Sequence, residues 1–460
     1  MSFGRLIGAL SLALAVGVTH SGAGAQVVSH DLEVLAADGA PGDQMGYATA
    51  LSGDWLVLGA PGNDDLFTDA GSVYVFDLSI DSPFGTQKHE LHARDADAGD
   101  NFGVSVAVQT GLIVVGANTN DDLGLDSGAA YLFDPVSGTQ GLKLLAPDGV
   151  AGDLFGSSVG VEGIFVAVGA HGDDDRGSAS GAVYVYDASI DIFDNGALEY
   201  KLAPADGNAG DFFGYALAMG EGLLVVGAYS DDDLGADSGS VYVYDAPTGV
   251  LQHKLHAVDG AAGDQFGFSV AVGGGVIAVG APGDDDGGAQ SGSVYLFDSV
   301  TGLPIRKLVS PSGGFNQQFG FDVALSGGLV GVGVPFDDDN GVFSGSAFLF
   351  EAGSGAVRAK LLPSDGGTSE QFGYSLAMHA DTVAVGTRYD IDRGALAGAA
   401  YLFEDVCPAD VNGDGVIDNG DLSAFIAIFL TQSPATDFNN DGVIDNGDIA
   451  AFITAFLAGC

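Results

Sequence analysis

The chain has 460 residues and a formal net charge of −49 at pH 7, because 62 residues are Asp or Glu and only 13 are Lys or Arg. This charge excludes nucleic acids and anionic membrane surfaces as favourable partners, since both are bound through basic patches. Hydrophobic residues make up 47% of the chain and Gly accounts for 75 residues, a combination that favours a folded core with many tight turns over disorder.

Residues 1–25 predict a secretory signal peptide. Arg5 precedes an apolar stretch over residues 6–18, and the small residues Ala-Gly-Ala follow at 23–25, as at a signal cleavage site. Neither this stretch nor any other reaches the roughly 20 apolar residues that a membrane-spanning helix needs. We therefore expect a secreted, soluble protein at an extracellular or cell-surface location, with tethering by an uncleaved signal as the alternative.

A unit that recurs seven times occupies residues 26–405. Each copy is anchored by a Phe-Gly pair, which is Met-Gly in the first copy, and a second Gly and an aromatic residue follow the anchor at constant spacings. The anchor pairs are Met45-Gly46, Phe102-Gly103, Phe155-Gly156, Phe213-Gly214, Phe266-Gly267, Phe319-Gly320 and Phe372-Gly373. The second glycines are Gly59, Gly116, Gly169, Gly227, Gly280, Gly333 and Gly386, and the aromatic residues are Tyr74, Tyr131, Tyr184, Tyr242, Tyr295, Phe348 and Tyr401. These constant spacings predict a repeat protein of seven structural units.

We expect four strands in each unit. The Val, Tyr, Phe and Ala content of the repeats, interrupted by Gly and Asp, is typical of strands and not of helical solenoids. Strand A follows the anchor, strand B ends at the second Gly, strand C carries the aromatic residue, and strand D is a short segment ending in an apolar residue. Four-stranded sheets repeated radially make a propeller, so the sequence predicts an all-β, seven-bladed β-propeller.

The two ends of the repeat region complement each other. The seventh unit stops after its strand C at Phe403-Glu404, whereas residues 31–37 supply a strand D before the first anchor. We expect this N-terminal strand to close the last blade and lock the ring.

Charged residues mark strand D. The residue before its apolar position is Lys in five units, and Glu33 and Glu90 stand there in the other two. The five lysines are Lys143, Lys201, Lys254, Lys307 and Lys360. We interpret these charges on the outermost strand as protection against edge-to-edge aggregation.

The loops before strand A and after strand B are acidic and share one face of the predicted propeller. The loops before strand A contribute Asp38, Asp95, Asp148, Asp206, Asp259 and Asp365. The loops after strand B hold the Asp runs 64–65, 121–122, 173–175, 231–233, 284–286 and 337–339. Calcium takes six to eight oxygens, whereas consecutive Asp side chains point apart, so metal binding and Asx-turns exposed to solvent both remain open.

The repeat resembles the FG-GAP repeats of the integrin α-chain propeller over residues 31–405. The resemblance rests on the Phe-Gly anchor and on Gly-Ala-Pro, as in Met45-Gly46 with 59–61 and Phe266-Gly267 with 280–282. It implies a seven-bladed propeller that acts in extracellular recognition. Integrin-type repeats carry an Asp-x-Asp-x-Asp-Gly calcium loop between the two signatures, but this chain has short hairpins such as 271–275 there, so those calcium sites are not carried over.

An enzyme would need residues that are unique to one blade, and few are present. His171, Tyr229, Asn118 and Arg388 occupy the variable position two residues after the second Gly. They either shape a ligand site or are ordinary variable loop residues. The sequence contains no nucleophile elbow, phosphate loop or zinc motif, and we predict no catalytic residues.

Residues 406–460 contain two calcium-loop motifs, which begin at Asp410 and Asp437. Both motifs match the 12-residue calcium loop. They have oxygen ligands at positions 1, 3, 5, 9 and 12, a carbonyl at position 7 and Gly at position 6, although position 12 is Asp instead of Glu. The predicted ligands are Asp410, Asn412, Asp414, Val416, Asp418 and Asp421 in the first loop and Asp437, Asn439, Asp441, Val443, Asp445 and Asp448 in the second. The sequence therefore predicts two bound calcium ions.

Each calcium loop runs into one predicted helix with a single apolar stripe. The stripes are Leu422, Phe425, Ile426, Phe429 and Leu430, and Ile449, Phe452, Ile453, Phe456 and Leu457. Paired loop–helix units of this kind resemble a type I dockerin module, in which Asp at position 12 is usual. The resemblance implies calcium-dependent folding and docking to a cohesin-like partner. The final Gly459-Cys460 also resembles modules that sort or anchor proteins at the surface of free-living bacteria.

Cys407 and Cys460 are the only two cysteines and bracket this module. An exported protein permits a disulfide, and two packed loop–helix units would bring the ends of the module together. We expect a Cys407–Cys460 bridge, with a sorting or attachment thiol at Cys460 as the alternative.

These observations predict a non-catalytic binding or adhesion protein. Its propeller would recognise an extracellular protein or glycan, and its C-terminal module would mediate docking or anchoring. The alternative is a polysaccharide-degrading enzyme or an accessory subunit, because dockerins often accompany such enzymes and propellers can host hydrolase or lyase sites. Paired carboxylates in a cleft, or a blade-specific cluster of His, Arg and Tyr, would favour this alternative.

Overall fold

The computed structural model describes residues 26–28, 32–79, 85–109, 111–188 and 197–404, and eight residues of the C-terminal module. The predicted signal peptide, all twelve predicted calcium ligands and both cysteines lie outside the described residues. The propeller and the residues from Cys407 onward form separate compact units.

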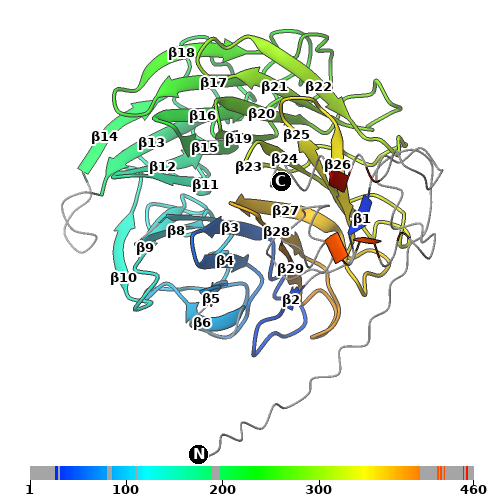
Figure 1. The fold of residues 1–460 in the computed structure, drawn as a ribbon. Helices are drawn as coiled ribbons and strands as arrows, with labels where there is room; N and C mark the ends of the chain where they lie inside the picture. The colour runs from blue at the N-terminus through cyan, green and yellow to red at the C-terminus, as the bar shows by residue number, and fades with distance from the viewer. Residues whose placement is uncertain are drawn as a thin grey trace, which may run out of the picture. The chain divides into compact units, whose positions relative to one another are not determined.

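The described residues form seven blades, which are arranged radially around a central axis (Figure 1). Each blade has four antiparallel strands, and the sheet of blade six has a fifth, the short strand Gln26–Val28. Blades one and two comprise β3 (Ala48–Ser52), β4 (Trp55–Ala60), β5 (Ser72–Asp77) and β6 (Thr86–Leu91), then β7 (Ser105–Gln109), β8 (Leu112–Ala117), β9 (Ala129–Phe133) and β10 (Gln140–Leu144). Blades three and four comprise β11 (Phe155–Glu162), β12 (Phe165–Ala170), β13 (Ala182–Asp187) and β14 (Ala197–Leu202), then β15 (Ala216–Gly220), β16 (Leu223–Ala228), β17 (Ser240–Asp245) and β18 (Val250–Leu255). Blades five and six comprise β19 (Ser269–Gly273), β20 (Val276–Ala281), β21 (Ser293–Asp298) and β22 (Pro304–Val309), then β23 (Val323–Ser326), β24 (Leu329–Val334), β25 (Ser346–Glu351) and β26 (Val357–Leu361).

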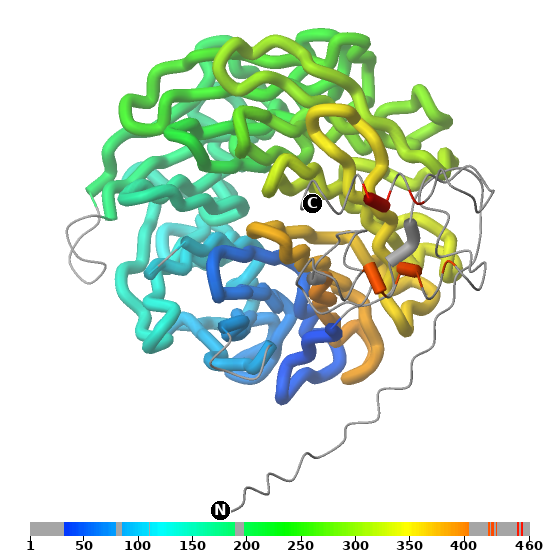
Figure 2. The backbone as a smooth tube through the Cα atoms, in the orientation of Figure 1, coloured from blue at the N-terminus to red at the C-terminus, as the bar shows by residue number. Residues whose placement is uncertain are grey.

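The seventh blade is closed by the N-terminal part of the chain. It contains β27 (Phe372–His379), β28 (Thr382–Thr387) and β29 (Ala399–Glu404), and its outer strand is β2 (Leu32–Val34), which follows the short strand β1 (Gln26–Val28). Strand β2 pairs antiparallel with β29, with Glu33 opposite Tyr401 and Val34 opposite Ala400. The blue β2 lies beside the orange and brown strands of the last blade in Figures 1 and 2. The predicted strand assignment, the blade count and the closure are confirmed.

The core consists of seven apolar layers, one between each pair of neighbouring blades. The layer between blades one and two, for example, packs Val57 and Val75 against Ile113 and Val115. Alternation along each strand sends successive side chains to opposite faces of its sheet, so both faces of every blade are buried against a neighbour. This is why strands B and C are apolar at nearly every position.

In blades two to seven the anchor Phe packs against the aromatic residue of strand C, and the contact is edge-on in all of them except blade six, where the rings are tilted. Phe102 lies 5.5 Å from Tyr131 between ring centroids, with an interplanar angle of 71°. Comparable pairs form between Phe155 and Tyr184 at 5.4 Å and between Phe213 and Tyr242 at 5.3 Å. Edge-to-face aromatic pairs contribute roughly 0.5–1.5 kcal/mol beyond burial of their area, so the constant spacing between anchor and aromatic residue has a packing reason.

The described residues of the C-terminal module are Leu422, Ser423, Phe425, Ile426, Phe429, Ile449, Phe452 and Ile453, and each is helical. Phe425 and Phe452 stack at 4.1 Å with an interplanar angle of 2°, and both are buried. Ile426 and Ile453 are instead exposed, at 48% and 43%. The predicted apolar stripe is therefore divided, because its Phe positions pack together whereas these two Ile side chains remain accessible. Among the described residues, no helix is long and apolar enough to cross a membrane.

Candidate functional site

The loops before strand A and after strand B lie on one face of the propeller, because strand direction alternates within each antiparallel blade. We call this the loop face. The end of each loop after strand B is joined to the anchor of the next blade, as in the bridges Gly128–Phe155 and Gly181–Phe213. The loop face is thus built from contiguous segments of neighbouring repeats.

Acidic clusters centred on the strand-D lysines occupy the outer part of the loop face. In blade three, Lys201 Nζ lies 2.9 Å from Asp148, 2.8 Å from Asp173 and 2.6 Å from Asp175. It also lies 5.0 Å from the centroid of the Tyr184 ring. Corresponding clusters of ion pairs surround Lys143, Lys254, Lys307 and Lys360.

The interpretation of these lysines as guards of an exposed edge is wrong. The Lys201 side chain is only 19% exposed, because it crosses the aromatic residue of strand C and ends among carboxylates of two loops. An ammonium group held this way is retained by charge pairing, since an unpaired buried charge is costly. Burial lowers the pKa of Lys201, but hydrogen bonds to Asp173, Asp175 and Asp148 outweigh it and raise the pKa overall.

The three-residue Asp runs distribute their side chains among different partners. In blade four, Asp231 accepts a hydrogen bond from the Tyr242 hydroxyl at 3.0 Å, and Asp232 accepts one from the backbone N–H of Asp237 at 2.8 Å. Asp233 pairs with Lys254 at 2.5 Å. Asp231 also lies 3.2 Å from Lys254 Nζ. The first and third carboxylates of the run therefore converge on the lysine, whereas the middle one serves a turn.

Two blades have glutamate where the others have this lysine. In blade one, carboxylate oxygens of Asp38, Asp65 and Glu90 all lie within 4.8 Å of one another, and Glu33, Asp365 and Asp392 are arranged in the same way in blade seven. Burial raises the pKa of Glu90 to about 8, with further contributions from Asp38 and Asp65. These two groups have the donor types and proximity that a divalent cation requires.

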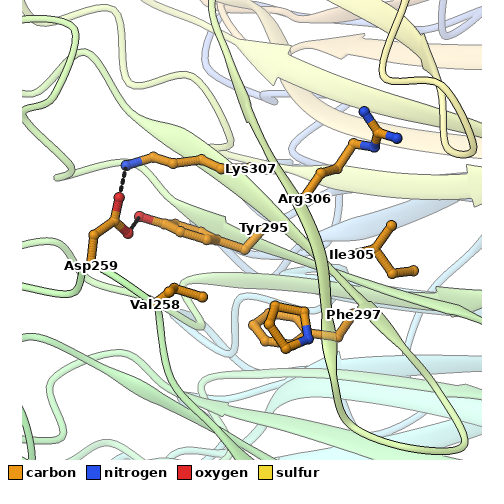
Figure 3. A pocket seen from close by; sticks show the side chains of 8 residues that line it. Val258, Asp259, Tyr295, Phe297, Ile305, Arg306 and Lys307 are labelled. Carbon is orange, nitrogen blue, oxygen red and sulfur yellow. Dashed lines mark hydrogen bonds and ion pairs between the residues drawn. The ribbon is translucent and has the colours of Figure 1, made fainter.

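Pockets on the described surface border two of the lysine clusters. One of about 440 Å³ is lined by Asp175, Arg176, Lys201 and Ala203. Figure 3 shows a second, of about 370 Å³, in blade five, where Lys307 and Tyr295 both contact Asp259. Four of its eight lining residues are apolar and three are charged, and strand D contributes Ile305 and Arg306 to it.

A belt of aromatic side chains surrounds part of the propeller axis on the loop face. Its members directly follow the anchor Gly at the start of strand A, the innermost strand of each blade. They are Tyr215, Phe268, Phe321, Tyr374 and Tyr47, and successive ring centroids lie 5.2, 5.1, 4.9 and 5.2 Å apart. We call these five residues the aromatic belt. Blades two and three have Val104 and Ser157 at this position, so the belt is open on that side.

Arg388 lies against the belt. Its guanidinium carbon lies 4.1 Å from the ring centroids of both Tyr374 and Tyr389, and 5.8 Å from that of Tyr47. Arg388 also donates a hydrogen bond to the Tyr389 hydroxyl. A guanidinium bordered by three aromatic faces is held by cation–π attraction, so this blade-specific residue is part of a built arrangement.

The position that Arg388 holds in blade seven is occupied in other blades by His171, Tyr229 and Asn118. His171 lies 5.5 Å from the belt residue Tyr215, and Tyr229 lies 4.5 Å from it. Burial lowers the pKa of His171 to about 4, so its imidazole is neutral at neutral pH. Asn118 holds this position in blade two, where Val104 takes the place of a belt residue and the belt does not continue.

The belt and one partly buried carboxylate were not predicted from the sequence. The signal for the belt was an aromatic residue directly after the anchor Gly in five repeats. This carboxylate belongs to Asp322. Four other blades have a serine at the equivalent position, and its hydroxyl donates a hydrogen bond to a backbone carbonyl of the next blade. These serines are Ser105, Ser158, Ser269 and Ser375. Asp322 accepts instead from the backbone N–H of Leu376 at 2.7 Å, and burial raises its pKa to about 7.

Comparison with family models gives two matches. The FG-GAP repeat matches residues 31–76, 86–133, 139–186, 197–244, 250–297, 305–350 and 356–403, and the dockerin type I domain matches residues 408–457. A search of curated proteins finds no match to the chain. Among solved structures, the crystal structure of the computationally designed Ika8 protein is 15% identical, with a TM-score of 0.45 over 83% of this chain and 99% of that chain. A likeness at this level identifies neither a fold nor a function.

Proposed function

Because this chain belongs to the FG-GAP repeat family and carries a dockerin type I domain at residues 408–457, we propose that it is a secreted, non-catalytic, calcium-dependent binding protein. In this proposal the propeller binds an extracellular protein or glycan through its loop face. The dockerin domain docks the protein to a cohesin-type partner or holds it at the cell surface.

The observation that carries the propeller half of the proposal is the aromatic belt with Arg388. All five belt side chains are only partly buried, whereas the anchor Phe side chains and the aromatic residues of strand C are buried. Partly exposed aromatic faces beside an Arg are typical of recognition sites for proteins and small polar ligands. The rings supply apolar area, and the guanidinium supplies fixed hydrogen-bond donors.

The docking half of the proposal rests on the dockerin match and on the helical residues of that module. Phe425 and Phe452 occupy equivalent places in its two halves and stack on each other. The adjacent Ile426 and Ile453 are exposed and are related by the same internal repeat. Two accessible apolar side chains supported by a buried aromatic stack are suited to binding a protein partner.

A second candidate, action on a polysaccharide, is favoured by the blade-specific Arg388 beside Tyr47 and Tyr374, and by His171 beside the belt residue Tyr215. The charge states weigh against it. Burial raises the pKa of Tyr374, and Arg388 lowers it by less, so this phenol is a poor base at neutral pH. His171 is partly buried, and its pKa of about 4 makes it a weak base. A glycoside hydrolase would also need a pair of carboxylates flanking the scissile bond.

The proposal is tested by binding of the full-length protein to two classes of probe. Immobilised type I cohesin domains should capture it with calcium and release it with EDTA. Purified extracellular proteins and insoluble polysaccharides from the source organism should retain it through the propeller. The double variant Tyr374→Ala/Arg388→Ala should lose the second interaction and keep the first, whereas Asp410→Ala/Asp437→Ala should do the reverse.

The outcomes separate the candidates. Retention by neither class of probe would refute a binding role. Release of new reducing ends or unsaturated sugars from a polysaccharide, abolished by Arg388→Ala, would establish the enzymatic alternative.

A further inference from the structure

Large apolar side chains are exposed on the loop face of three consecutive blades. Blades seven, one and two each carry two of them in the loop after strand B, at 43–67% exposure. They are Ile391 and Leu396, Leu66 and Phe67, and Leu123 and Leu125. We call these six residues the apolar arc. The corresponding loops of blades three and five, which the structure describes in full at residues 171–181 and 282–292, expose no large apolar side chain.

The three loops of the arc lie next to one another along the loop face. Blades seven and one meet where the ring closes, and there the N–H of Gln44 donates to the carbonyl of Leu396 at 3.0 Å. The loop of blade one is joined to blade two in a similar way, because the N–H of Gly99 donates to the carbonyl of Thr68 at 2.9 Å. The arc therefore spans the closure of the ring.

The turns of these loops do not require the apolar residues. In blade five Gly287 and Ala289 take the places of Leu123 and Leu125 of blade two. Both loops are nevertheless closed by the same backbone hydrogen bond, from the glycine between these residues to the carbonyl three residues earlier, at 3.0 Å in each blade. Exposed apolar side chains that the local fold does not need are typical of a surface that binds a partner.

Blade six connects the arc to the aromatic belt. Its loop after strand B is joined to blade seven by the bridge Gly345–Phe372. In this loop the exposed Phe343 lies 5.5 Å from Phe336 between ring centroids, and Phe336 lies 6.1 Å from the belt residue Phe321. None of these three rings is fully buried. Accessible apolar surface therefore extends from the loops of the arc to the belt around the axis.

Exposed carboxylates lie among the residues of the arc. Asp64 and Asp65 directly precede the arc residues of blade one, and Asp392 lies between those of blade seven. All three are exposed, and none forms an ion pair with a lysine, arginine or histidine in the described part of the chain. These two blades also have glutamate in place of the strand-D lysine. The surface around the arc therefore favours a positively charged partner.

The same features disfavour other occupants. A second copy of this chain also has a net charge of −49 and would be repelled, as would an anionic membrane surface. A sugar ring needs a flat aromatic face, whereas the arc is mostly aliphatic and successive belt rings are inclined to one another by 44–53°. An apolar patch bordered by polar groups is instead typical of a contact with another protein.

We propose that the partner of the loop face is a basic protein, which places apolar side chains on the arc and lysine or arginine side chains beside Asp64, Asp65 and Asp392. Buried apolar area supplies affinity, and the opposite charges orient the partner and speed its association. Arg388 fits such a partner, because a guanidinium can donate to backbone carbonyls, as Arg306 does to carbonyls of the next blade. The inference names the class of partner and rests on the proposed binding function.

Binding of a synthetic amphipathic peptide to the full-length, calcium-loaded protein tests the inference. The probe is a fluorescently labelled peptide with the repeat Leu-Lys-Lys-Leu-Leu-Lys-Leu, and fluorescence anisotropy at physiological ionic strength measures its affinity. One control peptide has Glu in place of every Lys, and a second has Ser in place of every Leu. We expect the Leu/Lys peptide to bind, the Glu peptide not to bind, and the Ser peptide to bind at least tenfold more weakly.

An arc variant locates the apolar part of the site. Leu125→Ser/Ile391→Ser removes apolar area from the arc, and we expect it to bind the Leu/Lys peptide about tenfold more weakly, which corresponds to about 1.4 kcal/mol. Val300→Ser/Leu303→Ser is the matched control, because both side chains are exposed, at 81% and 63%, in the loop after strand C of blade five. This control should bind the peptide as the wild type does.

A charge variant tests the carboxylates separately. We expect Asp65→Asn/Asp392→Asn to weaken binding of the Leu/Lys peptide about threefold, and the difference from the wild type to disappear at high salt, where charges are screened. Asp54→Asn/Asp381→Asn is the matched control, since these exposed aspartates lie in the turns between strands A and B of the same two blades. Circular dichroism verifies the β-structure of each variant.

Equal affinity of the wild type and the arc variant for the Leu/Lys peptide would overturn the inference, as would equal binding of the Glu peptide. If the arc variant does not fold, the charge variant decides, and an affinity equal to that of the wild type would overturn the inference as well. Retention of a neutral polysaccharide or an acidic protein through the propeller, without binding of the Leu/Lys peptide, would also overturn it but would leave the proposed binding function standing.

Discussion

Gly59 in strand B of blade one packs directly against the backbone carbonyl of Gly103, the anchor glycine of blade two. A Cβ atom on Gly59 would overlap the Gly103 oxygen, and Gly103 itself has a φ of +95°. The two signature glycines of the repeat therefore belong to one contact between neighbouring blades, where the backbones approach too closely for any side chain.

We expect Gly59→Ala to destabilise the propeller by about 3 kcal/mol, because the methyl group forces two blades apart. Gly353→Ala is the matched control, since a Cβ there meets no atom within 4 Å. Chemical denaturation of both variants provides the measurement. Equal unfolding midpoints for the two would show that the close approach is not required.

Removal of residues 31–37 should leave blade seven without its outer strand. Val34 is buried at 3% exposure in the layer between blades seven and one, and its loss exposes both that layer and the edge of β29. We expect a lower melting temperature and concentration-dependent aggregation by light scattering. Val34→Ala keeps the strand and should cost only about 1–2 kcal/mol, so similar behaviour of the two variants would contradict the closing role of β2.

Lys201→Ala should destabilise blade three by about 2 kcal/mol, because three carboxylates lose their common counter-ion while the site remains partly open to solvent. Lys88→Ala provides the comparison, since Lys88 makes a single pair with Asp77 and its side chain is 33% exposed. We expect that variant to lose less than about 1 kcal/mol. Thermal unfolding at low and high salt measures both, and a larger loss from Lys88→Ala would contradict the role assigned to the clusters.

The stability of the propeller should fall between about pH 4 and pH 7 because of Asp322. Burial raises the pKa of this carboxyl from 3.8 to about 7, so the folded protein retains a proton that the unfolded chain has released. The contribution of Asp322 is most favourable below pH 4 and is lost as pH rises to 7, by at most about 1.4 kcal/mol per pH unit.

Asp322→Ser, which restores the residue of four sister blades, should remove this dependence. The difference in unfolding free energy between variant and wild type should therefore grow in favour of the variant from pH 4 to pH 7. A difference that does not change with pH would mean that Asp322 titrates normally.

Intact-mass analysis tests the predicted Cys407–Cys460 disulfide. The secreted protein should resist alkylation until it is reduced and should then gain two adducts. Two alkylated thiols before reduction, or a covalent modification of Cys460, would favour the attachment role instead.

The sequence alone determined the architecture of this protein. Constant spacing of Phe-Gly, Gly and an aromatic residue predicted seven four-stranded blades, and the incomplete seventh repeat predicted closure by residues 31–37. These features could be predicted because each repeat encodes the same local strand pattern and the same contact with its neighbour. The paired motifs of residues 410–448 likewise predicted the dockerin domain that the family comparison identifies.

Only the tertiary structure decided what the charged and aromatic positions do. Lys201 could be placed on strand D from sequence, but its surroundings depend on two loops that are 53 and 28 residues earlier in the chain. Tyr47 belongs to the first repeat and Tyr374 to the last, and they meet only because the ring closes. Spacing along one chain predicts which strand carries a residue. The partner across a blade or around the axis is instead set by packing between repeats, and this packing creates the candidate binding face.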